Sequence, residues 1–133
     1  MRRGEVLKVR WADLDEAKRT LHISQTKNGH ARTIPLTSRA LSILLARRPD
    51  SPSNNELVFP TTEDAVKMAW RRIMGRTDLP DFRYHDLRHE AVTRFFELGL
   101  SIPEVALISG HRDTRMLMRY THLKAESVVG KLP

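Results

Sequence analysis

The sequence predicts an α+β domain that is mostly helical, with a small antiparallel β-hairpin or sheet near its N-terminus. Two observations support this fold class. Residues 20–24 and 32–36 alternate apolar and polar side chains around an Asn-Gly pair at 28–29, which is typical of two strands joined by a tight turn. After residue 37, leucines at helical spacing indicate a helix, and proline and glycine interrupt the pattern further on. With 133 residues and 40% hydrophobic content, the chain can bury one core, so we expect one domain.

Local signals place the first elements. Residues 3–9 predict a short helix, and a turn begins at 13–15. The Asn-Gly pair of the hairpin puts Lys27 at a loop tip. After the hairpin, Thr37 or Ser38 can cap a helix that runs toward Arg48 and is ended by Pro49. A surface loop over 49–55 follows.

The remainder of the chain predicts helices separated by breaks. They are expected at 62–76, at 84–98, from Ser101 to Gly110, and from about Thr114 onward. Gly99 closes the second of these, and Gly110 stops the third. The last one holds Tyr120 near its middle or end. Four apolar residues of the 84–98 helix are interpreted as core rather than site: Leu87, Val92, Phe95 and Phe96. The two tryptophans, Trp11 and Trp70, are expected to be packing residues.

The composition is strongly basic. A formal net charge of +7 and a pI near 10.4 favour a polyanionic partner, because lysine and arginine replace the counterions condensed on nucleic acid. Charge alone would also suit RNA or an anionic membrane. The chain has no cysteine, hence no disulfide framework and no thiolate metal site. No apolar run is long enough for a membrane helix or signal peptide, so we expect a cytoplasmic protein without membrane association.

Four basic or nucleophilic groups in the second half point to phosphate chemistry. His85 and Arg88 are three residues apart, so on a helix they share a face and can converge on one small target. His111 follows Gly110 and offers a further donor. Tyr120, next to an arginine, supplies a hydroxyl that can attack phosphorus and remain attached to it. The pattern therefore predicts covalent catalysis on a phosphodiester.

Taken with two stretches of the first half, these residues resemble the tyrosine recombinases of the phage integrase family over nearly the whole chain. The opening stretch 1–15 is similar to the segment that carries the family's first catalytic arginine, with an acidic residue three positions later. Arg2 and Glu5 stand at those positions. The stretch 26–36 resembles the hairpin that presents the catalytic lysine, here Lys27. His85, Arg88, His111 and Tyr120 match the remaining positions.

The resemblance and phosphate chemistry together suggest a role for each residue. Arginine makes paired hydrogen bonds to phosphate and stays charged, so Arg2 and Arg88 are expected to clamp the scissile phosphate. His111 would add a third donor. The resemblance assigns the general acid for the departing 5′ oxygen to Lys27. Tyrosine ionises near pH 10, so Tyr120 needs a partner that takes its proton. His85 is the expected base, and Glu5 would orient basic side chains.

The resemblance also implies partners. Double-stranded DNA is the expected substrate, cleaved and rejoined through a 3′-phosphotyrosyl intermediate that needs no cofactor and no metal. Family members assemble on DNA as tetramers and place further helices and a DNA-clamping domain ahead of the first arginine. Residues 1–133 are thus expected to be a catalytic domain truncated at its N-terminus, and the activity of the isolated fragment stays open.

Two other interpretations remain. Residues 102–123 have the build of a helix-turn-helix, so the chain could be a DNA-binding module without catalysis. It could also be a degenerate integrase remnant. Taken singly, each site residue has a simpler structural explanation, such as an exposed ion pair between Arg2 and Glu5. His85 and His89 are four residues apart, a spacing that suits zinc, but no third ligand pattern accompanies them.

Overall fold

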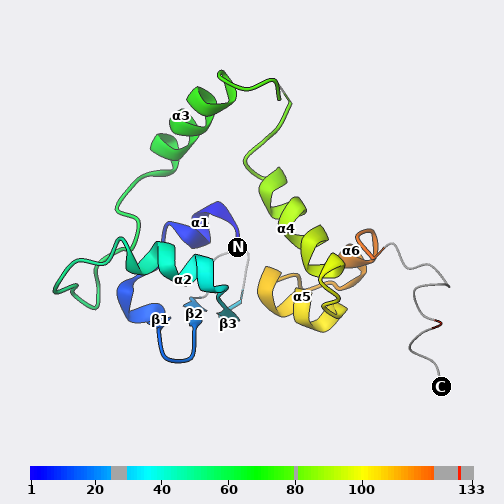
Figure 1. The fold of residues 1–133 in the computed structure, drawn as a ribbon, viewed down its shortest axis with the longest axis horizontal. Helices are drawn as coiled ribbons and strands as arrows, with labels where there is room; N and C mark the ends of the chain where they lie inside the picture. Colours follow the sequence, from blue (N-terminus) through cyan, green and yellow to red (C-terminus); the bar gives the residue numbers. More distant parts are fainter. Residues whose placement is uncertain (25–29, 80, 122–128, 130–133) are drawn as a thin grey trace.

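A computed structural model of the chain describes residues 1–24, 30–79, 81–121 and 129 (Figure 1). It confirms the predicted α+β class, with a small antiparallel sheet near the N-terminus and helices over the rest. In chain order the elements are α1 (Arg3–Val6), the 3₁₀ helix η1 (Trp11–Asp13), β1 (Leu14–Asp15), β2 (Thr20–Ile23), β3 (Arg32–Pro35), α2 (Ser38–Leu45), α3 (Glu63–Met74), α4 (Asp86–Glu97), α5 (Ile102–Ser109) and α6 (Arg115–Met118).

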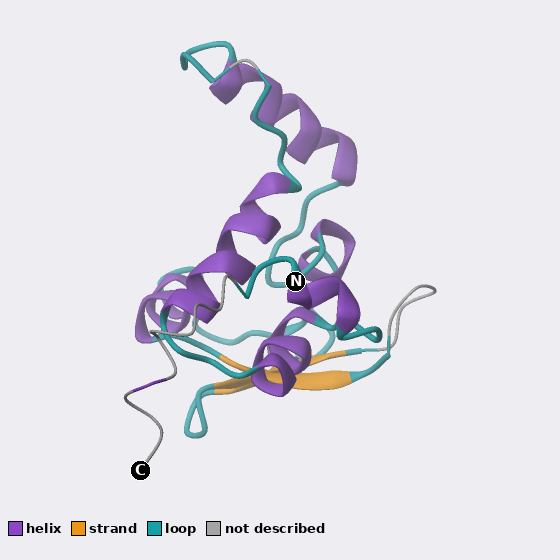
Figure 2. Ribbon diagram, turned by 90° about the vertical axis from the view of Figure 1, so that its right-hand side faces the viewer, coloured by secondary structure: helices purple, strands orange, loops and turns teal. Residues whose placement is uncertain are grey.

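The three strands form one sheet in the order β1, β2, β3, and both pairings are antiparallel. Successive side chains of a strand point to opposite faces, so Leu21 and Ile23 are buried while His22 between them is exposed. The first core cluster forms on the buried face: Val9, Trp11, Leu21, Ile23, Ile34, Leu44 and Val58. In Figure 2 most helices lie above the sheet, and one helix lies in front of the strands. The predicted hairpin strands are therefore confirmed.

A second core cluster joins the last three helices. Val92 of α4, Val105 of α5 and Leu117 of α6 are its buried members. Met1 lies where the two clusters meet, because it lines a cavity with Ile34 of the first cluster and Val92 of the second. The start of the chain, including Arg2, is thus held between the sheet and α4. By contrast, α3 has no buried residue and projects from the rest of the molecule (Figures 1 and 2).

Several boundaries differ from the sequence-based expectation. The first helix ends at Val6 rather than near residue 9. His85 is the N-cap residue of α4 and precedes the helix instead of lying in it. Leu87 was expected in the core, but 44% of its surface is exposed because it faces the cavity beside α4. The last helix ends at Met118, so Tyr120 lies beyond it.

The early end of α6 has a local cause. The Arg119 side chain donates a hydrogen bond to the Met116 carbonyl, and the Thr121 hydroxyl donates to the Met118 carbonyl. These side chains therefore donate to carbonyls that would accept hydrogen bonds from backbone N–H groups if the helix continued for another turn. Tyr120 is held just past the helix, where its ring packs against the second core cluster.

Gly110 ends α5 in a conformation that only glycine adopts easily. Its φ is +74°, in the left-handed region. A Cβ atom at this position would also lie 2.6 Å from Cζ of Arg32 on β3, closer than real Cβ contacts. Gly110 therefore allows the end of α5, and with it His111, to lie directly against the sheet.

We expect Gly110→Ala to destabilise the fold more than Gly99→Ala. Gly99 has a similar φ of +83°, but a Cβ there would meet nothing within 4 Å. Both changes should cost about 1–2 kcal/mol for the left-handed backbone, and Gly110→Ala should add roughly 1–3 kcal/mol for crowding a packed site. Urea unfolding of the two variants measures the difference. Equal losses would show that Arg32 moves aside freely.

Candidate active site

Two arginines that are far apart in the sequence line one cavity beside α4. Arg2 precedes α1, Arg88 lies on α4, and His85 lines the same cavity, whose volume is about 560 Å³. In the part of the chain that the structure describes, one terminal nitrogen of each arginine is buried without a hydrogen-bond partner. The Arg2 nitrogen forms an ion pair with Glu5 at 3.6 Å, too long for a hydrogen bond. Because buried cationic N–H groups without hydrogen-bond acceptors are costly, the cavity is suited to an anion.

Electrostatic crowding of the cations supports the same conclusion. Burial and the neighbouring Arg2 lower the pKa of Arg88 from its usual value, although Glu5 partly opposes this. Burial also lowers the pKa of His85, with further contributions from His89 and Arg88. A phosphate between these groups would relieve their mutual repulsion, because an opposite charge favours the charged form of a base.

His111 lies against Arg88 and is held by a hydroxyl. An Arg88 terminal nitrogen is 3.4 Å from His111 Nε2, and Ser109 Oγ is 2.7 Å from Nδ1. Because arginine can only donate, Nε2 accepts in this contact and the proton is assigned to Nδ1, which donates to Ser109. Burial, together with the positive charges of Arg88 and Arg2, lowers the pKa of His111 to about 4. His111 is thus neutral at pH 7 while no anion is present.

Glu5 and Arg32 form a buried ion pair next to Arg2. Both terminal nitrogens of Arg32 donate to the Glu5 carboxylate at 3.0 Å, and the two side chains are 2–3% exposed. The backbone N–H of Arg2 donates to the same carboxylate at 2.7 Å. Burial alone would raise the pKa of Glu5, but the hydrogen bonds from Arg32 and Arg2 outweigh it and lower the pKa. The Glu5 carboxylate is therefore buried, and its ion pair with Arg2 is exposed only on the Arg2 side.

The Tyr120 hydroxyl contacts an imidazole, but not the expected one. It is hydrogen-bonded to Nδ1 of His89, and the two rings stack with centroids 6.0 Å apart. No hydrogen bond joins His85 to Tyr120 among the described residues. The sequence assigned the base to His85, yet His85 stands at the N-cap of α4, one helical turn before His89. Arg119 places its guanidinium carbon 5.4 Å from the Tyr120 ring centroid.

The structure thus brings together most of the residues that the sequence singled out. Arg2, His85 and Arg88 share the cavity, and the Arg88–His111 contact extends the group toward the end of α5. Lys27 lies outside the described residues. Sequence reasoning missed three contributors: Arg32, His89 and Ser109. Only Arg32 carried a usable signal, since it stands two residues from Ile34, on the face of β3 that the alternation predicts to be buried.

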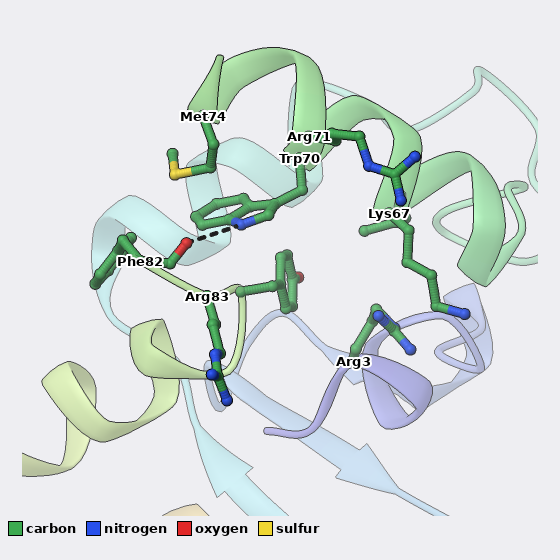
Figure 3. A pocket seen from close by; sticks show the side chains of 9 residues that line it. Arg3, Lys67, Trp70, Arg71, Met74, Phe82 and Arg83 are labelled. Atoms are coloured by element: carbon green, nitrogen blue, oxygen red, sulfur yellow. Dashed lines mark hydrogen bonds between the residues drawn. The ribbon is translucent and has the colours of Figure 1, made fainter. Parts of the chain in front are cut away.

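A second pocket adjoins the first and is lined by aromatic rings and cations (Figure 3). The Trp70 indole N–H donates to the Phe82 carbonyl, and Tyr84 meets the indole edge-on at 5.3 Å. Four cations belong to its lining: Arg3, Lys67, Arg71 and Arg83. Arg3 and Lys67 are already paired with Glu63 and Asp64 on α3. Trp70 is therefore a packing residue between α3 and the segment before α4, as predicted.

Neither a metal site nor a membrane span is found in the described ranges. No three histidine or carboxylate side chains gather there as metal ligands, so the His85–His89 pair has no third partner within those ranges. No helix among those residues is long and apolar enough to cross a bilayer.

We expect His111 to titrate far below the usual histidine pKa of about 6.5. Its pKa of about 4 means that the folded state resists protonation, so stability should fall as the pH drops from about 6.5 toward 4. NMR titration of the imidazole signals, assigned with His111→Gln, measures this value. Inorganic phosphate should raise the pKa, because an anion beside Arg2 and Arg88 favours imidazolium. A midpoint near 6.5 without added anion would contradict the described geometry.

The chain is similar to known integrases and recombinases. The family model described as the phage integrase family matches residues 1–127. The shufflon-specific DNA recombinase of Escherichia coli is 47% identical over 133 residues, which cover 99% of this chain and 34% of that protein. The chain therefore spans about a third of that relative's length.

Solved structures show the same fold. A XerA recombinase structure matches with a TM-score of 0.72 and 20% identity, over 99% of this chain and 52% of that one. A structure of the Tn1549 transposon integrase in complex with a circular intermediate DNA matches with a TM-score of 0.76 and 18% identity, over 98% of this chain and 53% of that one. Because the family model covers nearly all of the sequence, the chain belongs to the phage integrase family.

Proposed function

We propose that the chain is the catalytic domain of a site-specific DNA recombinase that cleaves and rejoins double-stranded DNA. The observation that carries this proposal is that Arg2 and Arg88 line one cavity beside α4, and each buries a terminal nitrogen without a hydrogen-bond partner in the described structure. A phosphodiester would supply acceptors for both arginines. The net charge of +7 further favours a nucleic acid over a small phosphate ester.

The chemistry requires a nucleophile, charge stabilisation and a proton for the leaving group. The Tyr120 oxygen attacks phosphorus, and the bond to the 5′ oxygen breaks, which leaves a 3′-phosphotyrosyl link. Negative charge grows on the non-bridging oxygens, where Arg2 and Arg88 can donate paired hydrogen bonds. Lys27 is the proposed acid that protonates the departing oxygen. A 5′-hydroxyl then attacks the link, so strand joining conserves the bond energy without a cofactor.

The two histidines of the proposed set act on the phosphate side. His85 lines the cavity with both arginines, so it is placed to donate to a phosphate oxygen. His111 is neutral before DNA binds, and its Nε2 accepts a hydrogen bond from Arg88. A bound phosphate would raise its pKa and convert Nε2 into a donor. His111 is therefore proposed to become the third donor only when the anion arrives.

The alternative of a helix-turn-helix module has less support. α6 has four residues, about 6 Å of helix, whereas a recognition helix lies along the major groove with several side chains reaching bases. Leu117 of α6 is also fully buried in the core. A module of that kind would not need Arg2, His85 and Arg88 in one cavity. We further propose that the protein acts in the cytoplasm and assembles on DNA as a tetramer, as the family resemblance implies.

The nucleophile is tested by covalent trapping on nicked DNA. We expect the wild type to form a protein–DNA adduct that survives denaturation, and Tyr120→Phe to form none, because it lacks the attacking oxygen. Tyr84→Phe is the matched control, since the chain has only these two tyrosines, and it should still form the adduct.

Two results would contradict the proposal. An adduct that persists in Tyr120→Phe would mean that another group attacks phosphorus. Salt-dependent DNA binding without any adduct would favour a binding module or a degenerate integrase, provided that it is also found with the full-length protein on its native attachment sequence.

A further inference from the structure

His89 occupies the position next to the nucleophile that a base requires. Its Nδ1 is hydrogen-bonded to the Tyr120 hydroxyl, and among the described residues the hydroxyl has no other hydrogen-bond partner. The two rings lie nearly parallel, with an interplanar angle of 22°. His89 comes from α4 and Tyr120 from the segment after α6, so the packing of those two helices against α5 fixes the contact.

A base for Tyr120 must accept the hydrogen bond of the phenol O–H. Only an unprotonated nitrogen can accept it, so we assign Nδ1 of neutral His89 as the acceptor and place the ring proton on Nε2. An imidazole in this state can take up the phenol proton without changing its position. His85 cannot replace it from where it lies, because its ring meets the edge of the His89 ring, with centroids 4.9 Å apart, and has no described contact with Tyr120.

The charged surroundings favour a negative phenolate. Arg88 precedes His89 on α4, and Arg119 lies over the Tyr120 ring. His85 faces His89 from the same helix, while His111 faces it from the end of α5. No carboxylate among the described residues is hydrogen-bonded to either ring. Negative charge on the Tyr120 oxygen is therefore stabilised from several sides, whereas nothing in this group opposes its formation.

We propose that His89 is the general base of the cleavage step, an inference that rests on the proposed recombinase function. As the Tyr120 oxygen bonds to phosphorus, its proton moves to Nδ1 of His89, and the bond from phosphorus to the 5′ oxygen breaks. The departing oxygen takes its proton from the general acid, for which Lys27 is proposed. In the rejoining step, a 5′-hydroxyl displaces the tyrosyl oxygen, and the His89 imidazolium returns the proton to it.

Two variants separate a base from a residue that only packs. His89→Asn places an amide oxygen near the position of Nδ1. This oxygen can accept a hydrogen bond from the Tyr120 hydroxyl, but it cannot take up the phenol proton near neutral pH. His89→Phe keeps the ring but has no acceptor. His22→Phe makes the same change on the exposed face of β2 and serves as the control. Circular dichroism and thermal unfolding verify that each variant folds.

The readout is the single-turnover rate of adduct formation by the full-length protein on nicked DNA, across a pH series. We expect both His89 variants to cleave about 10²-fold or more slowly than the wild type near neutral pH. The wild-type rate should level off once its base is deprotonated. In His89→Asn, the rate should keep rising with pH through the alkaline range, because only an ionised phenol, which forms near pH 10 in free tyrosine, can then attack.

A second substrate tests whether the slow cleavage of the His89 variants comes from poor activation of Tyr120 or from poor departure of the leaving group. Sulfur in place of the bridging 5′ oxygen makes a leaving group that needs no protonation. It should restore cleavage to Lys27→Ala, whose missing acid is then unnecessary, but not to His89→Asn. This pattern would distinguish a base for Tyr120 from a group that acts on the departing strand.

The outcomes separate this inference from the proposed function. Wild-type rates and an unchanged pH profile in His89→Asn would overturn the role of His89 while leaving recombinase chemistry in place. Rescue of His89→Asn by the sulfur substrate would also overturn it. If the wild type itself formed no Tyr120-dependent adduct, the proposed function would fail, and the assignment of His89 would fail with it.

Discussion

The buried ion pair between Glu5 and Arg32 is the interaction on which the site depends. It joins α1 to β3, two elements that are 27 residues apart at the points of contact. The Glu5 carboxylate accepts two hydrogen bonds from the Arg32 guanidinium on β3 and one from the backbone N–H of Arg2. Removing one member of such a pair typically costs about 3–5 kcal/mol, because the partner is left as an uncompensated buried charge. The pair thus holds the backbone of Arg2 in place.

Arg32 of this pair also packs against Gly110, the residue before His111. Arg32 lies so close to Gly110 that a methyl group would overlap its guanidinium. The end of α5 is therefore fitted to the sheet at the residue before His111, and His111 in turn contacts Arg88. The start of the chain, β3 and the end of α5 are distant in the sequence, and the charged side chain of Arg32 fills the space where they meet.

The sequence predicted the fold class, the hairpin strands and most helices because these depend on local patterns. Thr37 and Thr62, for example, accept hydrogen bonds from the backbone N–H groups at the starts of α2 and α3, as N-cap residues do. The short α6 was not predictable in this way, because side-chain bonds to its last carbonyls end it. The hydrogen-bond partner of the Tyr120 hydroxyl was not predicted either. Whether His85 or His89 meets Tyr120 depends on where α4 begins and on how the second core cluster packs.

The proposed site residues differ in how far the sequence alone could define them. The order of the site residues in the sequence indicated a phosphate site. Only the fold shows that Arg2 and Arg88 share a cavity. The fold also shows that the Tyr120 hydroxyl is hydrogen-bonded to the His89 imidazole. The alternation of β3 predicts that Arg32 is buried, but it does not predict its partner, Glu5, which comes from a distant segment.

The proposed reaction requires both arginines and the tyrosine to converge on one phosphorus atom. A crystal structure of the protein with nicked DNA and orthovanadate, which mimics the pentavalent transition state, tests this directly. We expect vanadium bonded to the Tyr120 oxygen, with its equatorial oxygens hydrogen-bonded to Arg2, Arg88 and His111. Vanadate seated away from Tyr120, or held without one of the two arginines, would contradict it.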